Sequence, residues 1–576
     1  MYYIHFFQND VINSVAKVDT NTAGGTGAGA ASDKDVLSLR GKSIEEKYAQ
    51  KLKKNMENKA KAQNREARMK EELFSNNKNK IDVIQEELLS KLGKDGSMNQ
   101  KHFYPPIPIM PPFQPIDNSI ALAKGVLTGN KPTLAGISSL LQSFLSEFHN
   151  ENMKNAHDKA DPDTVLTTYF DLAQKHLAPL DEAYRSKAVF PIRDDESIYL
   201  SLASFREHLL YETLSTAFDH AAHPDKLYIG AIVQNCFGKV NADGSIDASG
   251  KPCRTGAQVV GKNKKGRDMT KVSDAPVDKN GIADFCGDAK YKKYCDSGQI
   301  RVLYVHETES IGPAIARYYA SKLWGGETYF VQCDSHLHFA THWDQKYIDE
   351  VKSAKSYPKA VLSSYPPGFT EGQGTGEVNE SAGARLCTCQ FSTSDVENKI
   401  IRINTGNSYS GNEKHPTQIA FIAAGFFFAH SQFLVDVPFD PFMPWLFMGE
   451  EIALSVRAWT SGWDIYAPRK NLISHQYRPG RMGLPKFWGS VNRLYGRPMN
   501  NGLQGRVIDR VKNLVGYPES TDEIVKGRGD EIVLTDREHY GLGSERTLEE
   551  YMKLTQIDVE KKECRKMIWC NQGQLE

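Results

Sequence analysis

The pattern of hydrophobic and polar residues separates a polar first part of the chain from a second part, rich in apolar runs, that begins near residue 195. In the second part, short apolar runs alternate with helical patterns. The strand-like runs are 197–205 (SIYLSLASF), 226–235 (KLYIGAIVQN), 301–307 (RVLYVHE) and 327–336 (ETYFVQCDSH), and the helical patterns are 206–221 and 312–324. Nearly continuous apolar strands that alternate with helices are typical of a mostly parallel sheet with helices on both faces. We therefore predict a Rossmann-like α/β domain over residues 191–500.

The residues outside this domain carry weaker signals. Residues 1–116 contain a Gly/Ala/Thr tract, a charged helical stretch and the run YPPIPIMPPFQP, and we predict a flexible, low-complexity region. Residues 117–190 return to helical periodicity and predict a small helical region. We expect residues 501–576 to form a C-terminal extension that packs on the main domain.

Composition excludes several classes of protein. The 71 basic and 71 acidic side chains cancel, so no overall field favours nucleic acid. Nowhere do about 18 consecutive apolar residues occur, and the N-terminus lacks the apolar core of a signal peptide, so we expect no membrane association. Nine cysteines without a pair of CxxC motifs indicate ordinary reduced thiols rather than a disulfide framework or a structural zinc site. These features predict a soluble, cytoplasmic protein.

Candidate chemistry begins at Asp334-Ser335-His336, where an apolar strand ends. Side chains two residues apart in an extended segment point the same way, so Asp334 and His336 can converge on a divalent cation such as Mn²⁺. A cation there would neutralise a leaving diphosphate, as a nucleotide-sugar enzyme requires. Two alternatives compete: Asp334 can cap the next helix, and His338 and His342 form a HxxxH pair that suits zinc.

Three later segments supply further candidates. Gly425, in a very apolar stretch, can let the backbone approach a ligand, or it can be a packing glycine in a buried strand. Glu450 and Glu451 come just before a helical pattern, where they can bind sugar hydroxyls or simply favour the helix N-terminus. His475, after a predicted strand, is a candidate third metal ligand, although taken alone it is more typical of an ordinary polar residue.

These motifs, in this order, resemble one known enzyme family. The run GPAIARYYASKLWGGETYFVQCDSHLHFATHWD, followed by AAGFFFAHSQFL, MPWLFMGEEIALSVRAWTSGWDIYAP and SHQY, is similar to the cytoplasmic polypeptide hydroxyproline alpha-N-acetylglucosaminyltransferases. The resemblance runs from about residue 195 to residue 560. The same core resembles the mucin-type polypeptide N-acetylgalactosaminyltransferases. Both families are retaining transferases with the A-type glycosyltransferase fold, so the resemblance implies that fold here.

The resemblance also implies roles for individual residues. Asp334, His336 and His475 would hold the metal, and Asp334, Glu450 and Glu451 would be catalytic, although Glu451 stands where the mucin-type enzymes carry an asparagine. The residues implied at the sugar-nucleotide donor are Ser204, Arg206, Asp334, Ser335, Gly425 and Glu450.

The implied activity is transfer of N-acetylglucosamine from UDP-N-acetylglucosamine to a hydroxyl, expected to be hydroxyproline, of a cytoplasmic protein such as a ubiquitin-ligase adaptor. The expected cofactor is Mn²⁺, with Mg²⁺ as the alternative, and the likeness implies a homodimer. Three other readings stay open: the same fold with another UDP-sugar or acceptor, a non-catalytic interaction protein, and a zinc hydrolase built on His338 and His342.

Overall fold

The computed structural model describes residues 133–241, 245–256, 258–369, 378–380, 383–407, 413–477 and 487–573. The predicted low-complexity region 1–116 and the start of the predicted helical region lie outside the described residues. Contacts divide the chain into two units, residues 1–77 with 523–530 and residues 78–522 with 531–576. The central sheet, the helices that cover it and the candidate site all belong to the second unit.

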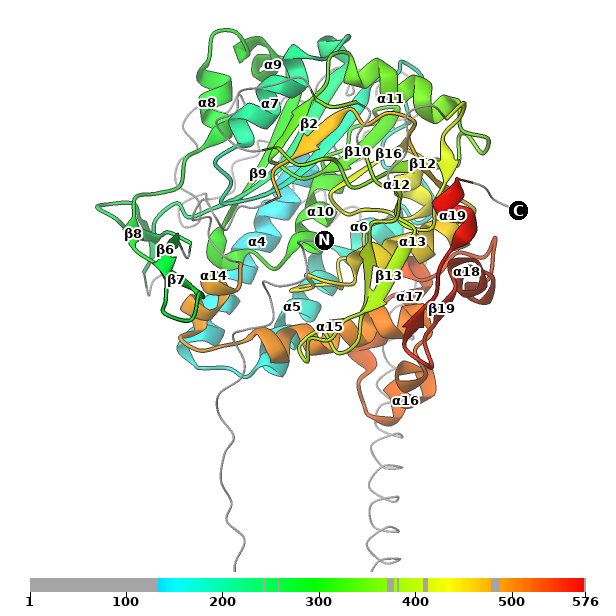
Figure 1. Cartoon of the computed structure of the whole chain (residues 1–576). Helices are drawn as coiled ribbons and strands as arrows, with labels where there is room; N and C mark the ends of the chain where they lie inside the picture. Colours follow the sequence, from blue (N-terminus) through cyan, green and yellow to red (C-terminus); the bar gives the residue numbers. More distant parts are fainter. Residues whose placement is uncertain are drawn as a thin grey trace, which may run out of the picture. The chain divides into compact units, whose positions relative to one another are not determined.

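An eight-stranded sheet forms the centre of this unit, in the order β15-β17-β12-β16-β10-β1-β2-β9 (Figure 1). Its strands are β1 (Ile198–Phe205), β2 (Leu227–Asn235), β9 (Ile300–His306), β10 (Tyr329–Cys333), β12 (Ala360–Ser363), β15 (Thr417–Gln418), β16 (Phe426–His430) and β17 (Asp464–Ala467). Four of its pairings are parallel, whereas β16 runs antiparallel to β10 and β12, and β15 antiparallel to β17. The predicted α/β fold with a mostly parallel sheet is confirmed.

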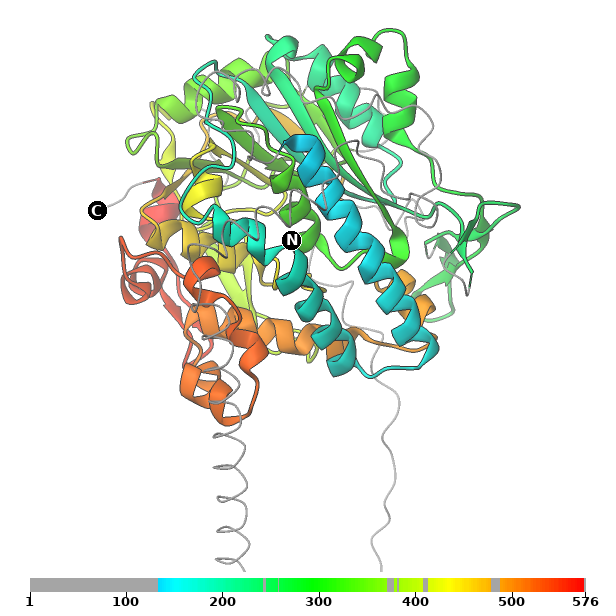
Figure 2. The same ribbon diagram turned by 180° about the vertical axis from the view of Figure 1, so that it is seen from behind.

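Both faces of the sheet are covered, which explains why its strands are apolar throughout. In β1, Tyr199 packs into one hydrophobic cluster, while Ile198, Leu200 and Leu202 pack into the other. Such a division follows from the alternation of side chains along a strand. Figures 1 and 2 show the helices that bring the two clusters to either side of the sheet.

The helices that contribute to the first cluster are α4 (Leu134–His157), α5 (Pro162–His176), α10 (Pro313–Lys322), α13 (Glu450–Thr460), α14 (Phe487–Tyr495) and α15 (Asn500–Val515). Those that contribute to the second are α7 (Leu210–Asp219), α8 (Gly281–Gly287), α9 (Lys292–Asp296) and α11 (Trp343–Lys352). The shorter helices are α6 (Ala178–Ala183), α12 (Phe433–Asp436), α16 (Asp522–Gly527), α17 (Arg537–Tyr540), α18 (Leu548–Thr555) and α19 (Ile568–Gln572). None of the helices in the described residues combines the length and hydropathy that crossing a membrane requires.

Several two-stranded ribbons surround the main sheet. They pair β3 (Lys239–Val240) with β4 (Ile246–Asp247), β5 (Cys253–Arg254) with β8 (Asp274–Ala275), β6 (Gln258–Lys262) with β7 (Asp268–Lys271), β11 (Leu337–Phe339) with β18 (Ile473–His475), β13 (Thr388–Phe391) with β14 (Ile401–Asn404), and β19 (Ile557–Asp558) with β20 (Glu563–Cys564). The short 3₁₀ turns are Pro224–Lys226, Glu307–Glu309, Pro518–Ser520 and Glu531–Leu534.

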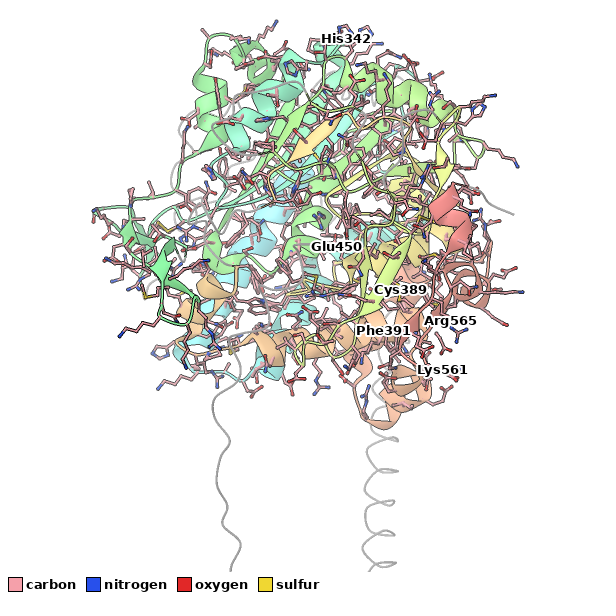
Figure 3. The ribbon with its side chains drawn as sticks, in the orientation of Figure 1. His342, Cys389, Phe391, Glu450, Lys561 and Arg565 are labelled. Atoms are coloured by element: carbon pink, nitrogen blue, oxygen red, sulfur yellow. A yellow bond between two sulfur atoms is a disulfide. The ribbon has the colours of Figure 1, made fainter. Side chains whose placement is uncertain are left out.

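The cysteines overturn one sequence-based expectation. Eight of the nine form the disulfides Cys236–Cys253, Cys286–Cys295, Cys387–Cys570 and Cys389–Cys564, and only Cys333 is a free, buried thiol. The prediction of ordinary reduced thiols is therefore wrong. Two of the bonds join residues 183 and 175 positions apart, so the fold creates the pairs and the local spacing could not reveal them. Figure 3 shows Cys389 close to Arg565, the neighbour of its partner in the chain.

Candidate metal and donor site

The carboxyl end of β10 carries the central group of the site. The parallel strands β1, β2, β9 and β10 all end at the same edge of the sheet, which is where open α/β sheets bind ligands. Asp334 follows β10 directly, and its Oδ2 lies 2.9 Å from Nε2 of His475 and 4.0 Å from Nε2 of His336. One ligand atom from each of the three side chains lies within 4.8 Å of the others. The structure thus brings the three predicted metal ligands together.

His475 reaches Asp334 because two neighbouring segments hold its backbone. On one side β18 pairs with β11, with His475 opposite Leu337. On the other side, the amide of His475 donates to the carbonyl of Pro367 at 2.9 Å, and the amide of Phe369 donates to the carbonyl of His475 at 3.1 Å. The backbone pairing therefore fixes a residue that lies 141 positions beyond Asp334 in the chain.

The donor set fits a divalent cation. One carboxylate and two imidazoles are ligands that suit Mn²⁺ and similar borderline metals. Burial raises the pKa of Asp334, but the hydrogen bond with His475 and the charge of Arg317 outweigh it, so the pKa falls below its ordinary value and the carboxylate stays ionised. Burial lowers the pKa of His475, which favours the neutral, metal-binding imidazole. Asp334, His336 and His475 are the residues that would hold the ion.

Glu207 orients His336 and was not found from the sequence. It follows β1 in the loop before α7, and its Oε2 lies 3.0 Å from Nδ1 of His336. Its Oε1 accepts a hydrogen bond from the amide of Leu209 at 2.9 Å. Burial raises the pKa of Glu207, but hydrogen bonds from His208 and His336 outweigh it and lower the pKa to about 2. An ionised carboxylate behind Nδ1 leaves Nε2 of His336 directed toward Asp334, as in carboxylate–histidine–metal arrangements.

Arg317 is a second residue that sequence reasoning missed. It lies on α10 with its side chain only 6% exposed, donates to Oδ1 of Asp334 at 3.1 Å and forms an ion pair with Glu450. Burial lowers its pKa, but the two carboxylates raise it above the ordinary value, so the guanidinium stays charged. An arginine within the apolar helix PAIARYYASK was the available signal, because buried arginines are nearly always paired.

Gly425 has a steric role beside Asp334. The amide of Asp334 donates to the carbonyl of Gly425 at 3.2 Å. A β-carbon added at Gly425 would lie 3.1 Å from Oδ2 of Asp334, tighter than ordinary contact. The absence of a side chain therefore makes room for the Asp334 carboxylate itself.

The two glutamates at the start of α13 have different surroundings. Glu450 forms the ion pair with Arg317 through Oε2, and its buried Oε1 has no hydrogen-bond partner among the described residues. Glu451 accepts hydrogen bonds from the hydroxyl of Tyr365 at 2.9 Å and from the amide of Ala424 at 3.0 Å. Burial raises the pKa of Glu450 and raises that of Glu451 to about 7. Glu450 thus has acceptor capacity available for a ligand, whereas Glu451 ties together backbone segments beside Gly425.

This geometry coincides with a match to a known family. A protein-family model described as "Glycosyltransferase (GlcNAc)" matches residues 197–561, more than half of the 576 residues. The chain belongs to this glycosyltransferase family. No curated protein matches the chain significantly.

One matching solved structure is the "Crystal structure of GalNAc-T7 with UDP, GalNAc and Mn2+". It is 14% identical, the match covers 65% of this chain and 56% of that chain, and the TM-score is 0.32. The glycosyltransferase therefore spans little more than half the length of that protein's chain.

The residues that the resemblance placed near the nucleotide lie at or just beyond the ends of the same strands. Ser204 is fully buried on β1, and its hydroxyl has no hydrogen-bond partner within the described part of the glycosyltransferase. Ser335 is also buried, and its hydroxyl lies 3.4 Å from the carbonyl of Ala203. The donor-binding roles of both serines remain predictions.

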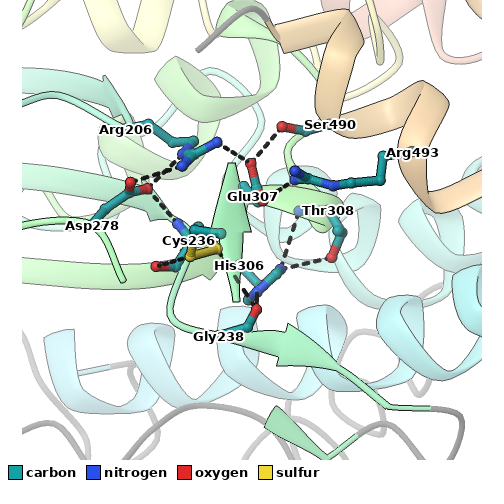
Figure 4. Close-up of a disulfide and its surroundings, with 10 residues drawn as sticks. Arg206, Cys236, Gly238, Asp278, His306, Glu307, Thr308, Ser490 and Arg493 are labelled. Atoms are coloured by element: carbon teal, nitrogen blue, oxygen red, sulfur yellow. Dashed lines mark hydrogen bonds and ion pairs between the residues drawn. A yellow bond between two sulfur atoms is a disulfide. The ribbon is translucent and has the colours of Figure 1, made fainter. Parts of the chain in front are cut away.

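Arg206 is held by carboxylates of the protein. Its guanidinium donates to both oxygens of Asp278, at 2.6 and 2.9 Å, and to Glu307 at 2.9 Å (Figure 4). Nε, Nη1 and Nη2 are all engaged in this way, which is the geometry of a structural arginine. Its donor-binding role remains a prediction.

His338 and His342 do not take part in a metal cluster among the described residues. His338 stacks on Phe369 with ring centroids 4.0 Å apart and lies 3.5 Å from Glu212. His342 precedes α11 at the periphery of the molecule (Figure 3). Within residues 133–573, as far as they are described, the one group of three suitable ligands is Asp334, His336 and His475. The HxxxH zinc hypothesis thus gains no support.

Proposed function

We propose that this glycosyltransferase is a retaining, divalent-metal-dependent enzyme that transfers N-acetylglucosamine from UDP-N-acetylglucosamine to a hydroxyl of a protein. The observation that carries the proposal is the convergence of Asp334, His336 and His475 at the carboxyl edge of the sheet in a member of a GlcNAc glycosyltransferase family. A divalent cation, by preference Mn²⁺ with Mg²⁺ as the alternative, would supply charge neutralisation for a leaving diphosphate.

Other residues of the site contribute charge, hydrogen-bond acceptors and support of the backbone. Arg317 keeps Asp334 ionised and adds a fixed positive charge beside it, in a site where electrostatic interactions are strong. The available Oε1 of Glu450 can accept a hydrogen bond from a donor sugar hydroxyl. Glu451, one residue further on, holds the Ala424–Gly425 backbone in place. Retention of configuration is proposed from the sequence resemblance, and NMR coupling constants of the product would test it.

The proposed acceptor is a hydroxyproline of a protein such as a ubiquitin-ligase adaptor, on the strength of the sequence resemblance. Synthetic hydroxyproline and proline peptides, compared as acceptors, test this point directly. A homodimer is proposed on the same basis, and light scattering after size-exclusion chromatography measures it.

The cytoplasmic location remains a proposal, but one of the two observations behind it no longer holds. It rested on reduced thiols, whereas the structure has four disulfides, and disulfides persist mainly in oxidising compartments. The disulfides favour an oxidising compartment instead. Non-reducing peptide mapping of protein from its native cells, together with fractionation, distinguishes the two locations.

The experiment that tests the activity measures free UDP released by purified protein from a panel of UDP-sugars, with and without Mn²⁺. Many transferases slowly hydrolyse their donor, so the assay needs no acceptor. We expect metal-dependent release from UDP-N-acetylglucosamine that disappears in Asp334→Ala and persists in His338→Ala, a matched change of a nearby histidine outside the cluster. Release that is independent of metal, or equal in Asp334→Ala, would contradict the proposal.

A further inference from the structure

A two-stranded arm leaves the main sheet between Cys253 and Asp278. It contains the β5/β8 and β6/β7 ribbons and projects from the side of the molecule (Figure 1). Its start is joined to the end of β2 by the disulfide Cys236–Cys253. At its end, Asp278 pairs with Arg206 and accepts a hydrogen bond from the amide of Cys236 at 2.7 Å (Figure 4). The arm is therefore anchored at both ends.

The arm has defined internal structure. The amide of Thr255 donates to the carbonyl of Ser273 at 2.8 Å, and the amide of Ser273 donates to the hydroxyl of Thr255 at 3.0 Å. At the tip, the side-chain oxygen of Asn263 accepts from the amides of Lys265 and Arg267 at 2.9 and 3.0 Å. Such a closed turn holds the backbone of the tip in one conformation.

Exposed apolar residues gather on this arm. Seven large apolar side chains are exposed among the described residues, and four of them are Val260 (58%), Met269 (46%), Val272 (46%) and Val277 (39%). Val260 lies at a bulge where β6 pairs irregularly with β7. Exposed apolar residues that share one short segment favour an interaction surface there.

The β6/β7 ribbon of the arm is strongly basic, although the chain as a whole has no net charge. Residues 258–272 contain five basic residues, Lys262, Lys264, Lys265, Arg267 and Lys271, and one acidic residue, Asp268, which gives a net charge of +4. All five basic residues are exposed. A local positive field of this kind attracts an acidic partner.

The arm also lies at the edge of the sheet that carries the metal and donor site. It leaves from the carboxyl end of β2, and Asp278 returns it to Arg206 at the carboxyl end of β1. Asp334 follows β10, which pairs in parallel with β1, so the arm and Asp334 belong to the same edge. A partner bound by the arm would be held at the edge where sugar transfer is proposed.

We propose that the arm is a docking site for an acidic, extended segment of the acceptor protein. The backbone favours such a partner, because in the described part of the chain β6 pairs only with β7, which leaves outer strand edges for an added strand. A membrane or single-stranded nucleic acid fits less well. Residues 253–278 contain no Phe, Trp, Tyr, Leu or Ile, the side chains that anchor proteins in lipid or stack on bases.

The identity of the docked segment as part of the acceptor rests on the proposed transferase function. Binding itself is tested without that assumption, by fluorescence anisotropy of the full chain with a short labelled peptide of alternating glutamate and valine. The probes for the other classes are phosphatidylserine vesicles and a single-stranded oligonucleotide. We expect tight binding of the acidic peptide that weakens as salt rises from about 0.05 to about 0.3 M.

Two arm variants locate the contact. K262E/K264E/K265E should weaken peptide binding by roughly tenfold or more, since each attraction becomes a repulsion. V260S/M269S should weaken it while leaving the charge unchanged. The matched control is K553E/K561E/K566E, which reverses three exposed lysines outside the arm. UDP release from UDP-N-acetylglucosamine should be the same in all three variants, so failure of the transferase function is visible independently of failure of docking.

Four results would overturn the proposal. The first is that the wild type and K262E/K264E/K265E bind the peptide equally well, and the second is that the control variant loses as much peptide binding as K262E/K264E/K265E. The third is that the vesicles or the oligonucleotide bind more tightly than the peptide and depend on the same lysines. The fourth is that the protein self-associates and the arm variants abolish this self-association.

Discussion

Replacing Glu207 isolates the contribution of an outer carboxylate to metal binding. The change Glu207→Gln keeps a side-chain oxygen that can accept from Nδ1 of His336 but removes the charge, whereas Glu207→Ala removes both. In the wild type the two atoms lie 3.0 Å apart, and the Glu207 side chain is only 5% exposed, so solvent screens the interaction little.

Two independent estimates give the size of the effect. A hydrogen bond to an ionised group contributes about 1.5–3 kcal/mol. Loss of a carboxylate behind a metal-binding histidine typically weakens metal affinity by about 10- to 100-fold, which is about 1.4–2.8 kcal/mol. We expect Glu207→Gln near the lower end and Glu207→Ala near the upper end, since glutamine keeps one of the two acceptor oxygens that serve His336 and the Leu209 amide, whereas alanine keeps neither.

The assay is titration of the purified protein with Mn²⁺, followed by electron paramagnetic resonance of the free ion. Glu212→Gln is the matched control, because Glu212 lies 3.5 Å from His338, a histidine outside the metal cluster. Circular dichroism confirms that each variant is folded. If Glu207→Ala binds Mn²⁺ as tightly as Glu212→Gln does, Glu207 has no part in positioning His336.

Three further changes test the surroundings of Asp334. Arg317→Met should reduce the free energy of unfolding by about 3–5 kcal/mol, measured by urea denaturation, because it leaves the buried Glu450 and the partly exposed Asp334 without their cation; an unchanged midpoint would contradict this. Gly425→Ala should weaken Mn²⁺ binding several-fold, because the added β-carbon presses on Asp334, whereas Gly505→Ala, with no atom within 4 Å, should leave it unchanged. Glu451 has a pKa near 7 when folded against an ordinary value of 4.5, so the folded state binds this proton more tightly, and its stabilising effect is lost as pH rises through 7. In EDTA, the Tm of wild type relative to that of Glu451→Gln should fall between pH 5 and pH 8, and a constant difference would refute the raised pKa.

The sequence predicted the parts of the site that depend on local spacing. Asp334 and His336 are two residues apart directly after β10, so their short spacing in the sequence keeps them near each other. Glu207 and Arg317 were missed because their partners lie 129 and 17 residues away, and no local pattern encodes those contacts. The sheet was predictable for a different reason, since burial on both faces makes its strands apolar throughout.

The partners of Arg206 and of the cysteines could not be predicted from the sequence. The sequence indicated that Arg206 lies at the end of a strand, but its partners Asp278 and Glu307 lie 72 and 101 residues further along the chain. The disulfide partners are likewise set by the folded chain, because Cys387, just before β13, and Cys389, on β13, meet the C-terminal segment only in three dimensions.

The paired bonds Cys387–Cys570 and Cys389–Cys564 make the attachment of the C-terminal segment redundant. The first bond alone closes a loop of 183 residues, which removes about 5 kcal/mol of chain entropy from the unfolded state. Once it exists, the second bond closes only the small ring through residues 387–389 and 564–570, which adds roughly half as much. Either bond alone would therefore retain most of this stabilisation, so the attachment of the C-terminal segment tolerates the loss of one cysteine pair.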